Sequence, residues 1–277
     1  SEMILMNSTW FFQKSLVQYF TVKSFFIAIF CGAACVTTQA QTTIAEDNFN
    51  YSGGSSLNGQ AGGTGWSSAW INDYTSGASL RVNTTGLSYP GLPAGGSAVW
   101  GSGGNGISED SRSLPLQDSG LVYLQFLGQF GATSGGGTPN IRLLDDGSLT
   151  GGIGANGGSS GSVISILDNS LQPASGGSSS STAKLSDLNL VVTLIDYQNK
   201  TTEMWLNPDL STFDYENPSS PDAVFANLAP VFNNVAIYSR SPVAVSNLQI
   251  MSVPEPLSVS LLGLGFALFP FIRQRRK

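Results

Sequence analysis

Hydrophobic and polar residues alternate over short runs in the middle of the chain, and glycine- and serine-rich breaks separate these runs. Residues 121–130 (LVYLQFLGQF) are aromatic-rich, residues 189–196 (NLVVTLID) are β-branched, and residues 201–207 (TTEMWLN) alternate polar with apolar. No long stretch repeats its apolar positions with the 3.6-residue period of an amphipathic helix. The pattern predicts an all-β sandwich with strands at 121–130, 189–196, 201–207, 232–239 and 246–251.

The predicted sandwich covers residues 41–252 as one domain, because sandwiches of about 200–250 residues are common as single units. Disorder is the competing interpretation of a chain with 33 glycines. Five Trp, eight Tyr and 15 Phe supply large apolar side chains that disordered segments lack. We therefore expect a folded sandwich with long loops at 151–161 and 173–184.

A short apolar run lies near the start of the chain. Residues 25–36 (FFIAIFCGAACV) follow two lysines, and the small-residue sequence 38–40 (TQA) precedes Gln41. A basic start, an apolar stretch of this length and a small-residue cleavage site are typical of a secretory signal peptide. We expect residues 1–40 to be this signal peptide, with cleavage between Ala40 and Gln41.

Both cysteines, Cys31 and Cys35, lie within this apolar run. The predicted body therefore has no thiol, as expected of an exported domain that relies on packing rather than disulfides. A core helix and lipid attachment at Cys35 are the alternative interpretations of the run.

The end of the chain combines a proline-rich motif, an apolar segment and a basic cluster. In chain order it contains Pro254, Glu255 and Pro256, the apolar residues 257–272, and the basic residues Arg273, Arg275, Arg276 and Lys277. An apolar helix of this length spans about 24 Å, somewhat less than a hydrocarbon core of about 30 Å. The positive-inside rule keeps the basic end cytoplasmic and places the body on the other side of the inner membrane.

This combination resembles the PEP-CTERM sorting signal, which exosortases recognise in Gram-negative bacteria. Pro254, Glu255 and Pro256 match the sorting motif, and the terminal arginines match the basic stop. The resemblance implies that residues 253–277 tether the protein transiently to the inner membrane. It also implies signal peptidase and exosortase as processing partners, with release to the cell surface or an exopolysaccharide matrix. A permanent single-pass anchor is the alternative.

The distribution of charge excludes several classes of function. The chain has no histidine, so a Ser/His/Asp triad, a histidine general base and a histidine-ligated metal are excluded. Within residues 41–252, 16 acidic residues stand against six basic ones, a net charge of −10. This balance excludes a nucleic-acid partner, which needs a basic surface, and favours neutral glycans, cations or matrix components over polyanions.

The start of the body carries a second resemblance. Residues 46–51 (EDNFNY), 56–70 (SLNGQAGGTGWSSAW) and 86–92 (GLSYPGL) are similar to the opening of exported PEP-CTERM proteins. The bodies of those proteins resemble concanavalin A-like lectin/glucanase sandwiches. The resemblance implies a jelly-roll (concanavalin A-like) sandwich flanked by the signal peptide and the C-terminal transmembrane sorting helix. It supports the fold rather than an activity.

The tryptophans have two interpretations. Trp66 and Trp70 follow a glycine-rich turn and either pack over an edge of the core or, if exposed, form a glycan-stacking platform. Trp100 and Trp205 stand at the apolar ends of strand-like runs, so we expect both in the core.

The acidic residues do not follow the pattern that a glycan hydrolase needs. Retaining glycosidases on this fold carry acids on alternate residues of one strand, which places them on the same face. Glu109–Asp110 and Asp145–Asp146 are adjacent pairs, and Asp214 and Glu216 lie in a turn-rich stretch. We expect all of these to be solvated loop acids and no catalytic residue. A secreted glycan hydrolase or lyase using Asp214 and Glu216 is the enzymatic alternative.

Two further motifs remain. Residues 152–157 (GIGANG) match GxGxxG, but a nucleotide site needs a preceding strand and a following helix, so we expect a compositional match within a linker. The sequence predicts no cofactor. Asp145-Asp146-Gly147 has the hard oxygen ligands that calcium prefers but lacks an EF-hand spacing. Calcium is therefore the one metal ion for which the sequence offers ligands, and it does not decide whether calcium binds.

Taken together, the sequence predicts an exported, non-enzymatic cell-surface or extracellular-matrix protein that contacts exopolysaccharide. The secreted hydrolase or lyase and the permanently anchored envelope protein are its alternatives.

Overall fold

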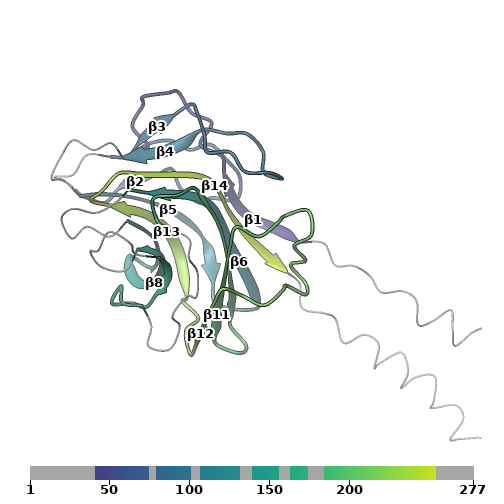
Figure 1. The fold of residues 1–277 in the computed structure, drawn as a ribbon. Helices are drawn as coiled ribbons and strands as arrows, with labels where there is room; N and C mark the ends of the chain where they lie inside the picture. Colours follow the sequence, from purple (N-terminus) through teal and green to yellow (C-terminus); the bar gives the residue numbers. More distant parts are fainter. Residues whose placement is uncertain are drawn as a thin grey trace, which may run out of the picture. The chain divides into compact units, whose positions relative to one another are not determined.

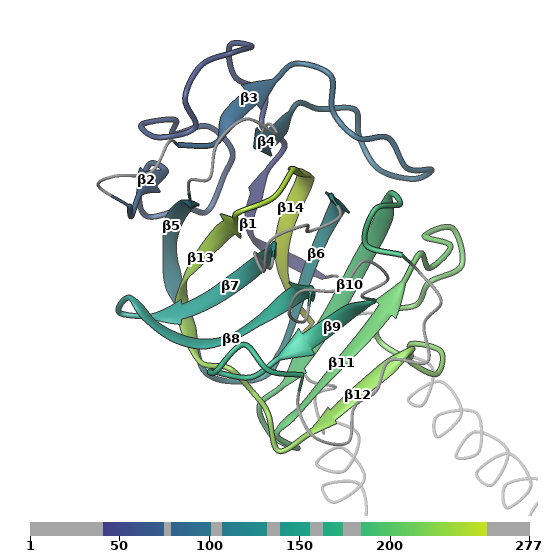
Figure 2. The same ribbon diagram turned by 60° about the vertical axis from the view of Figure 1, so that its left-hand side comes forward.

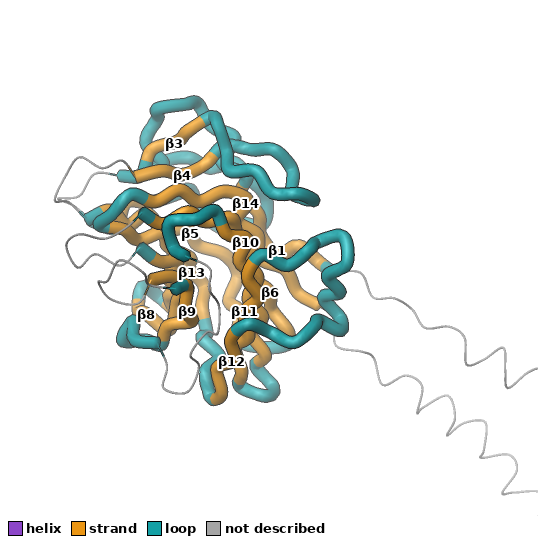
Figure 3. The backbone as a smooth tube through the Cα atoms, in the orientation of Figure 1, coloured by secondary structure: helices purple, strands orange, loops and turns teal. Residues whose placement is uncertain are grey.

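The computed structural model describes residues 41–74, 79–100, 107–131, 139–155, 163–173 and 184–253. Within these ranges the chain forms strands and loops only (Figure 1, Figure 3). The strands are β1 (Thr42–Asp47), β2 (Ile71–Asn72), β3 (Arg81–Asn83), β4 (Ser97–Trp100), β5 (Ser108–Gln117), β6 (Leu121–Phe130), β7 (Asn140–Asp145), β8 (Ser148–Ala155), β9 (Ile164–Leu167), β10 (Asn189–Asp196), β11 (Thr201–Leu206), β12 (Ala223–Ala226), β13 (Phe232–Ser239) and β14 (Val243–Val253).

These strands form two antiparallel sheets that face one another (Figure 2). The eight-stranded sheet has the order β12-β11-β10-β6-β14-β4-β3, and β1 pairs with β14 beside this path. The six-stranded sheet has the order β2-β5-β13-β7-β8-β9. The prediction of an all-β sandwich is confirmed.

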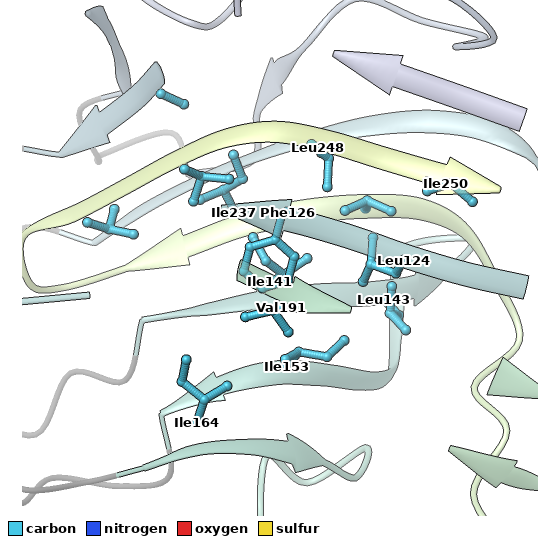
Figure 4. Packing of buried hydrophobic residues seen from close by; sticks show 14 of the residues in the cluster. Leu124, Phe126, Ile141, Leu143, Ile153, Ile164, Val191, Ile237, Leu248 and Ile250 are labelled. Carbon is cyan, nitrogen blue, oxygen red and sulfur yellow. The ribbon is translucent and has the colours of Figure 1, made fainter. Parts of the chain in front are cut away.

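The core lies between the two sheets because alternate residues of each strand point inward. Leu124 and Phe126 of β6 belong to one core cluster with Ile141 of β7 and Ile237 of β13 (Figure 4). All four side chains have 0% exposure. The strands predicted at 121–130, 189–196, 201–207, 232–239 and 246–251 correspond to β6, β10, β11, β13 and β14. Local sequence patterns were therefore sufficient to identify these strands.

A second apolar layer covers the outer face of the eight-stranded sheet. Tyr123 and Trp205 point outward from β6 and β11, and Tyr89, Phe213 and Tyr215 pack on them from two connecting loops. Trp205 is buried as predicted, and its indole N–H donates to a backbone carbonyl at 2.8 Å. The two loops therefore cover the aromatic side chains on the outer face of this sheet.

The prediction of a long loop at 151–161 is wrong in its first part. Residues 151–155 belong to β8, which hydrogen-bonds to β7 on one side and β9 on the other. Ile153 carries the apolar side chain that anchors this stretch in the core, and glycine occupies the alternate positions. The rest of that loop, and residues 174–183 of the second predicted loop, lie outside the described residues.

The predictions for the chain ends also fall outside the described residues. They concern the signal peptide 1–40 with Ala40, the sorting motif 254–256 and the basic residues Arg273, Arg275, Arg276 and Lys277. Gln41 is described and exposed, directly before β1. Among the residues that the structure describes, no helix is long and apolar enough to cross a membrane.

Candidate functional site

The two tryptophans of the N-terminal block pack into the protein. Trp70 has 0% exposure and stacks on Phe49 with ring centroids 5.9 Å apart. Trp66 is half-buried 6.0 Å from Trp70, and its indole N–H donates to the Glu46 carbonyl at 2.8 Å. An exposed two-indole platform is therefore wrong for Trp70, because a ring without exposed surface cannot stack on a sugar. Edge and core packing, the other interpretation, describes both residues.

Beneath these rings lies an ion pair between Asp47 and Arg112, whose side chains are 1% and 3% exposed. The Arg112 guanidinium donates to Asp47 at 2.7 Å. Asp47 also accepts hydrogen bonds from the Trp70 indole at 2.8 Å, the Tyr51 hydroxyl at 2.6 Å and the Phe49 backbone N–H at 2.8 Å. Burial and the neighbouring Asp47 raise the pKa of Tyr51. The carboxylate is fully occupied by internal donors, which is the pattern of a structural ion pair.

The adjacent acids Glu109 and Asp110 lie in β5, and the prediction that they are solvated loop acids is wrong. They point to opposite faces of the strand, as neighbouring residues must. Asp110 faces inward, has 0% exposure, and accepts from the Ser79 hydroxyl and the Leu80 N–H at 2.7 Å each. Burial raises the pKa of the Asp110 carboxyl. Asp110 thus fixes residues 79–80 against β5.

Glu109 points away from the core, onto the outer face of the six-stranded sheet. There Nη1 of Arg142 donates to both Glu109 oxygens at 3.0 Å each, and Nε of Arg142 donates to Asn140 at 3.2 Å. The guanidinium lies 3.5 Å from the ring centroid of Tyr238, a cation–π arrangement. Burial raises the pKa of Glu109 although Arg142 acts in the opposite direction. Three strands, β5, β13 and β7, therefore bring this group together.

We call this surface the polar face and define it by Asp73, Glu109, Asn140, Arg142, Ser165 and Tyr238. Its side chains are held closely: Glu109 and Tyr238 are each 7% exposed and Ser165 is 6% exposed. Yet the Tyr238 hydroxyl, the Ser165 hydroxyl and Nη2 of Arg142 make no hydrogen bond to any residue that the structure describes. Polar groups that are positioned but unpaired are the expected feature of a surface that binds a polar ligand.

Two glycines form the floor beside this cluster. Gly154 pairs with Asn140 and Gly152 with Arg142 across β7 and β8. A Cβ on Gly154 would lie 2.6 Å from the Cβ of Asn140, so glycine makes room for that side chain. The prediction that this part of GxGxxG lies in a linker is wrong, since residues 152–155 are strand. Residues 156 and 157 of the motif lie outside the described part of the chain, so the prediction that it is no nucleotide fingerprint stays a prediction.

The remaining acidic candidates lie in turns. Asp146 (φ 47°) and Gly147 (φ 80°) form the β7–β8 turn, and Asp146 accepts from the Asn233 side chain at 2.7 Å. Asp214 is exposed and accepts from the Glu216 N–H at 2.9 Å, closing its own turn. No group of three or more acidic, cysteine or histidine side chains in the described ranges is arranged to hold a metal ion.

Sequence reasoning missed Arg142, Asn140 and Tyr238. The available signal was weak: Arg142 is one of only six basic residues in the body and stands between Ile141 and Leu143 in its strand. A charged residue in such a strand needs a partner, but the sequence does not identify Glu109 as that partner, 33 residues away.

No protein-family model matches the chain, and no curated protein matches it. Among solved structures, the chain is similar to the globular domain of T. cruzi calreticulin (12% identity, 74% of this chain and 90% of that chain, TM-score 0.43). It is also similar to a glycosyl hydrolase family 16 protein from Mycobacterium smegmatis (12%, 76% and 100%, TM-score 0.42). A third is an alginate lyase from Corynebacterium sp. (10%, 66% and 93%, TM-score 0.40). These are distant likenesses of overall structure.

Proposed function

We propose that this protein is an exported, non-enzymatic glycan-binding protein of the cell surface or extracellular matrix, and that its polar face binds the glycan. The observation that carries the proposal is the set of unpaired groups around the Arg142–Glu109 pair. Sugars present many hydroxyls, each of which both donates and accepts, and binding sites for them need fixed donors and acceptors. The Tyr238 and Ser165 hydroxyls and Nη2 of Arg142 are groups of this kind on a rigid sheet.

The arrangement of acids favours binding over hydrolysis. Asp214 and Glu216, the pair named by the enzymatic alternative, lie in an exposed turn between β11 and β12, and Asp214 is occupied by backbone N–H groups. On the polar face, Glu109 is held by Arg142. Asp214 and Glu216 are therefore not arranged as a free acid and a free nucleophile, and Glu109 is engaged in an ion pair. We also propose the jelly-roll, concanavalin A-like type for the sandwich, which the resemblance of residues 46–92 supports.

The proposed route to the surface rests on the chain ends. Signal peptidase would remove residues 1–40, the C-terminal segment would tether the body transiently to the inner membrane, and exosortase would cleave near Pro254-Glu255-Pro256. The thiol-free, acidic body fits an extracellular location and a glycan rather than a polyanion as partner.

Removal of one hydroxyl tests the binding face. Tyr238→Phe in the full chain keeps the ring under Arg142 and deletes only the hydroxyl, so affinity for a bound polysaccharide should fall about threefold to tenfold. Affinity electrophoresis over a polysaccharide panel first finds the ligand and then compares the variant. Tyr89→Phe is the matched control, because it removes a hydroxyl from a loop on the other sheet. Equal affinities for the wild type and both variants would place binding elsewhere.

Intact-mass measurement of the surface and secreted fractions tests export and processing. The expected species begins at Gln41 and lacks the residues after the sorting motif. Glu255→Ala should leave a longer species in the membrane fraction. A surface species that retains residues 257–277 would establish permanent anchoring instead.

A further inference from the structure

The charged side chains of the polar face do not cancel one another. Its basic group, Arg142, is matched by Glu109 at 3.0 Å, so the two side chains together contribute no net charge. The other strands of this face, β8, β9 and β13, contain no charged residue. Among the six residues that define the polar face, the charge that remains is the carboxylate of Asp73.

Asp73 lies beside this pair through the pairing of β2 with β5. Ile71 pairs with Ser111 and Asn72 with Asp110, and the Asp73 N–H donates to the Glu109 carbonyl at 2.9 Å. By the two-residue alternation of a strand, Asp73 shares the outer face with Glu109. Its negative charge is close enough to raise the pKa of Glu109. The Asp73 carboxylate makes no hydrogen bond or ion pair with any part of the chain that the structure describes.

An independent observation points to a ligand at the same place. Tyr238 is more than nine-tenths buried, and its ring is fixed under Arg142, but its hydroxyl has no hydrogen-bond partner in the described ranges. A ligand that reaches Tyr238 and Nη2 of Arg142 with its hydroxyls comes next to Asp73 as well. That ligand meets one uncompensated negative charge.

We infer that the polar face selects glycans bearing a free amino group over glycans bearing a carboxylate. The ammonium of a hexosamine unit would pair with Asp73, while its ring hydroxyls would bond to Tyr238 and Arg142. A uronate would face the carboxylates of Asp73 and Glu109, and Glu109 already occupies Nη1 of Arg142, the one basic residue among the six that define the polar face. The inference rests on the proposed function and specifies its ligand class. The net charge of −10 on residues 41–252 also favours a cationic glycan over an anionic one.

Matched oligosaccharides test this selectivity on the full chain. The probes are β-1,4- and β-1,6-linked glucosamine hexamers, each as the free amine and as the N-acetyl form, and a hexamer of galacturonate, with Kd measured by calorimetry. We expect the free amine to bind about tenfold more tightly than the N-acetyl form, the typical gain of a charge-assisted hydrogen bond. Asp73→Asn should reduce the preference for the free amine over the N-acetyl form from about tenfold to about twofold or less.

Asp118→Asn is the control for overall charge. It removes the same charge from an exposed turn about 30 Å along β5 from Glu109 and should preserve the preference. Equal effects of the two variants, or a galacturonate affinity equal to that of the amine, would overturn the inference. Binding of the N-acetyl forms without an amine preference would overturn the inference and leave the proposed function intact. No binding of any probe, with no ligand found in the polysaccharide panel, would overturn both.

Discussion

Two arginine–carboxylate pairs meet at β5 from opposite sides, and they differ in how completely they are bonded. Arg112 on the inner face donates to Asp47, which also accepts from Tyr51, Trp70 and a backbone N–H. On the outer face, Glu109 accepts from Arg142 alone among the residues that the structure describes. The two interactions are chemically the same. We call the inner pair closed because the Asp47 carboxylate accepts hydrogen bonds from several internal donors, and the outer pair open because Glu109 accepts from Arg142 alone among the described residues.

The difference follows from the cost of burying charge. Removing two charges from water costs several kcal/mol per ion, and the cost is recovered only when the remaining hydrogen-bonding positions are filled. The inner pair fills them from its own chain, so it contributes to a unique packing of the N-terminal block against β5. The outer pair leaves Nη2 of Arg142 and the Tyr238 hydroxyl for another molecule. An ion pair alone therefore does not identify a binding site, whereas the unpaired groups around it do.

Breaking the inner pair should have the largest effect. Asp47→Ala leaves the buried Arg112 charge and the Trp70 and Tyr51 donors without an acceptor, so the free energy of unfolding should fall by about 3–5 kcal/mol. Urea unfolding followed by tryptophan fluorescence measures the change, and Asp47→Asn provides a milder variant if Asp47→Ala does not fold. A loss below about 1 kcal/mol would contradict a structural role for this pair.

Breaking the outer pair should cost less. Glu109→Gln keeps a hydrogen-bond acceptor for Arg142, whose side chain is 14% exposed and so retains contact with water. We expect a loss of about 1–2 kcal/mol in the same unfolding experiment. A loss as large as that of Asp47→Asn would mean that the two pairs are equally structural, and the distinction between them would fail.

The strands could be predicted from the sequence, but the polar face could not. The aromatic-rich residues 121–130 and the β-branched residues 189–196 are local signals, and they are sufficient to identify β6 and β10. The polar face depends on register, because Glu109, Arg142 and Tyr238 become neighbours only when β13 pairs with β5 on one side and β7 on the other. No local pattern specifies that register.

The burial of Glu109 and Asp110 could not be predicted for a related reason. The sequence predicts solvated loop acids, yet both are buried, each on a different face of β5. Asp110 is compensated by residues 79–80 and Glu109 by Arg142. Both partners are distant in sequence, so the compensation that makes burial tolerable is visible only in the folded chain.

Removing one tyrosine hydroxyl beside each ion pair compares how much each hydroxyl contributes to the free energy of unfolding. Tyr51→Phe removes a donor to Asp47, so the free energy of unfolding should fall by about 1 kcal/mol. Tyr238→Phe removes a hydroxyl with no partner in the described chain, and its effect should stay below about 0.5 kcal/mol. Thermal or urea unfolding of the two variants in parallel measures the difference. The reverse order would show that Tyr238 is the structural hydroxyl.

The dependence of stability on pH should show the smallest effect. The pKa of Glu109 is raised above its ordinary value of 4.5 by burial, so the folded state binds this proton more tightly than the unfolded chain does. The contribution of Glu109 to the free energy of unfolding should therefore decrease as pH rises from the ordinary value through the raised one. The difference in stability between the wild type and Glu109→Gln should be larger at pH 4 than at pH 7, by about a few tenths of a kcal/mol or more.

Asp110→Asn should show a change of the same sign, because burial also raises the pKa of Asp110. A difference that grows with pH for either variant would mean that the ion pair or the hydrogen bonds, rather than burial, control that carboxyl.

The most direct test follows both arginines in one experiment. The side-chain Nε–H signals of Arg112 and Arg142 can be observed by NMR in the full chain while a bound oligosaccharide is titrated in. Arg142 should shift in proportion to occupancy, and Arg112, enclosed by Asp47, Ser68 and Trp66, should not move. A saturable shift of Arg112, or bound glycan with no shift of Arg142, would contradict the assignment of binding to the open pair and of structure to the closed one.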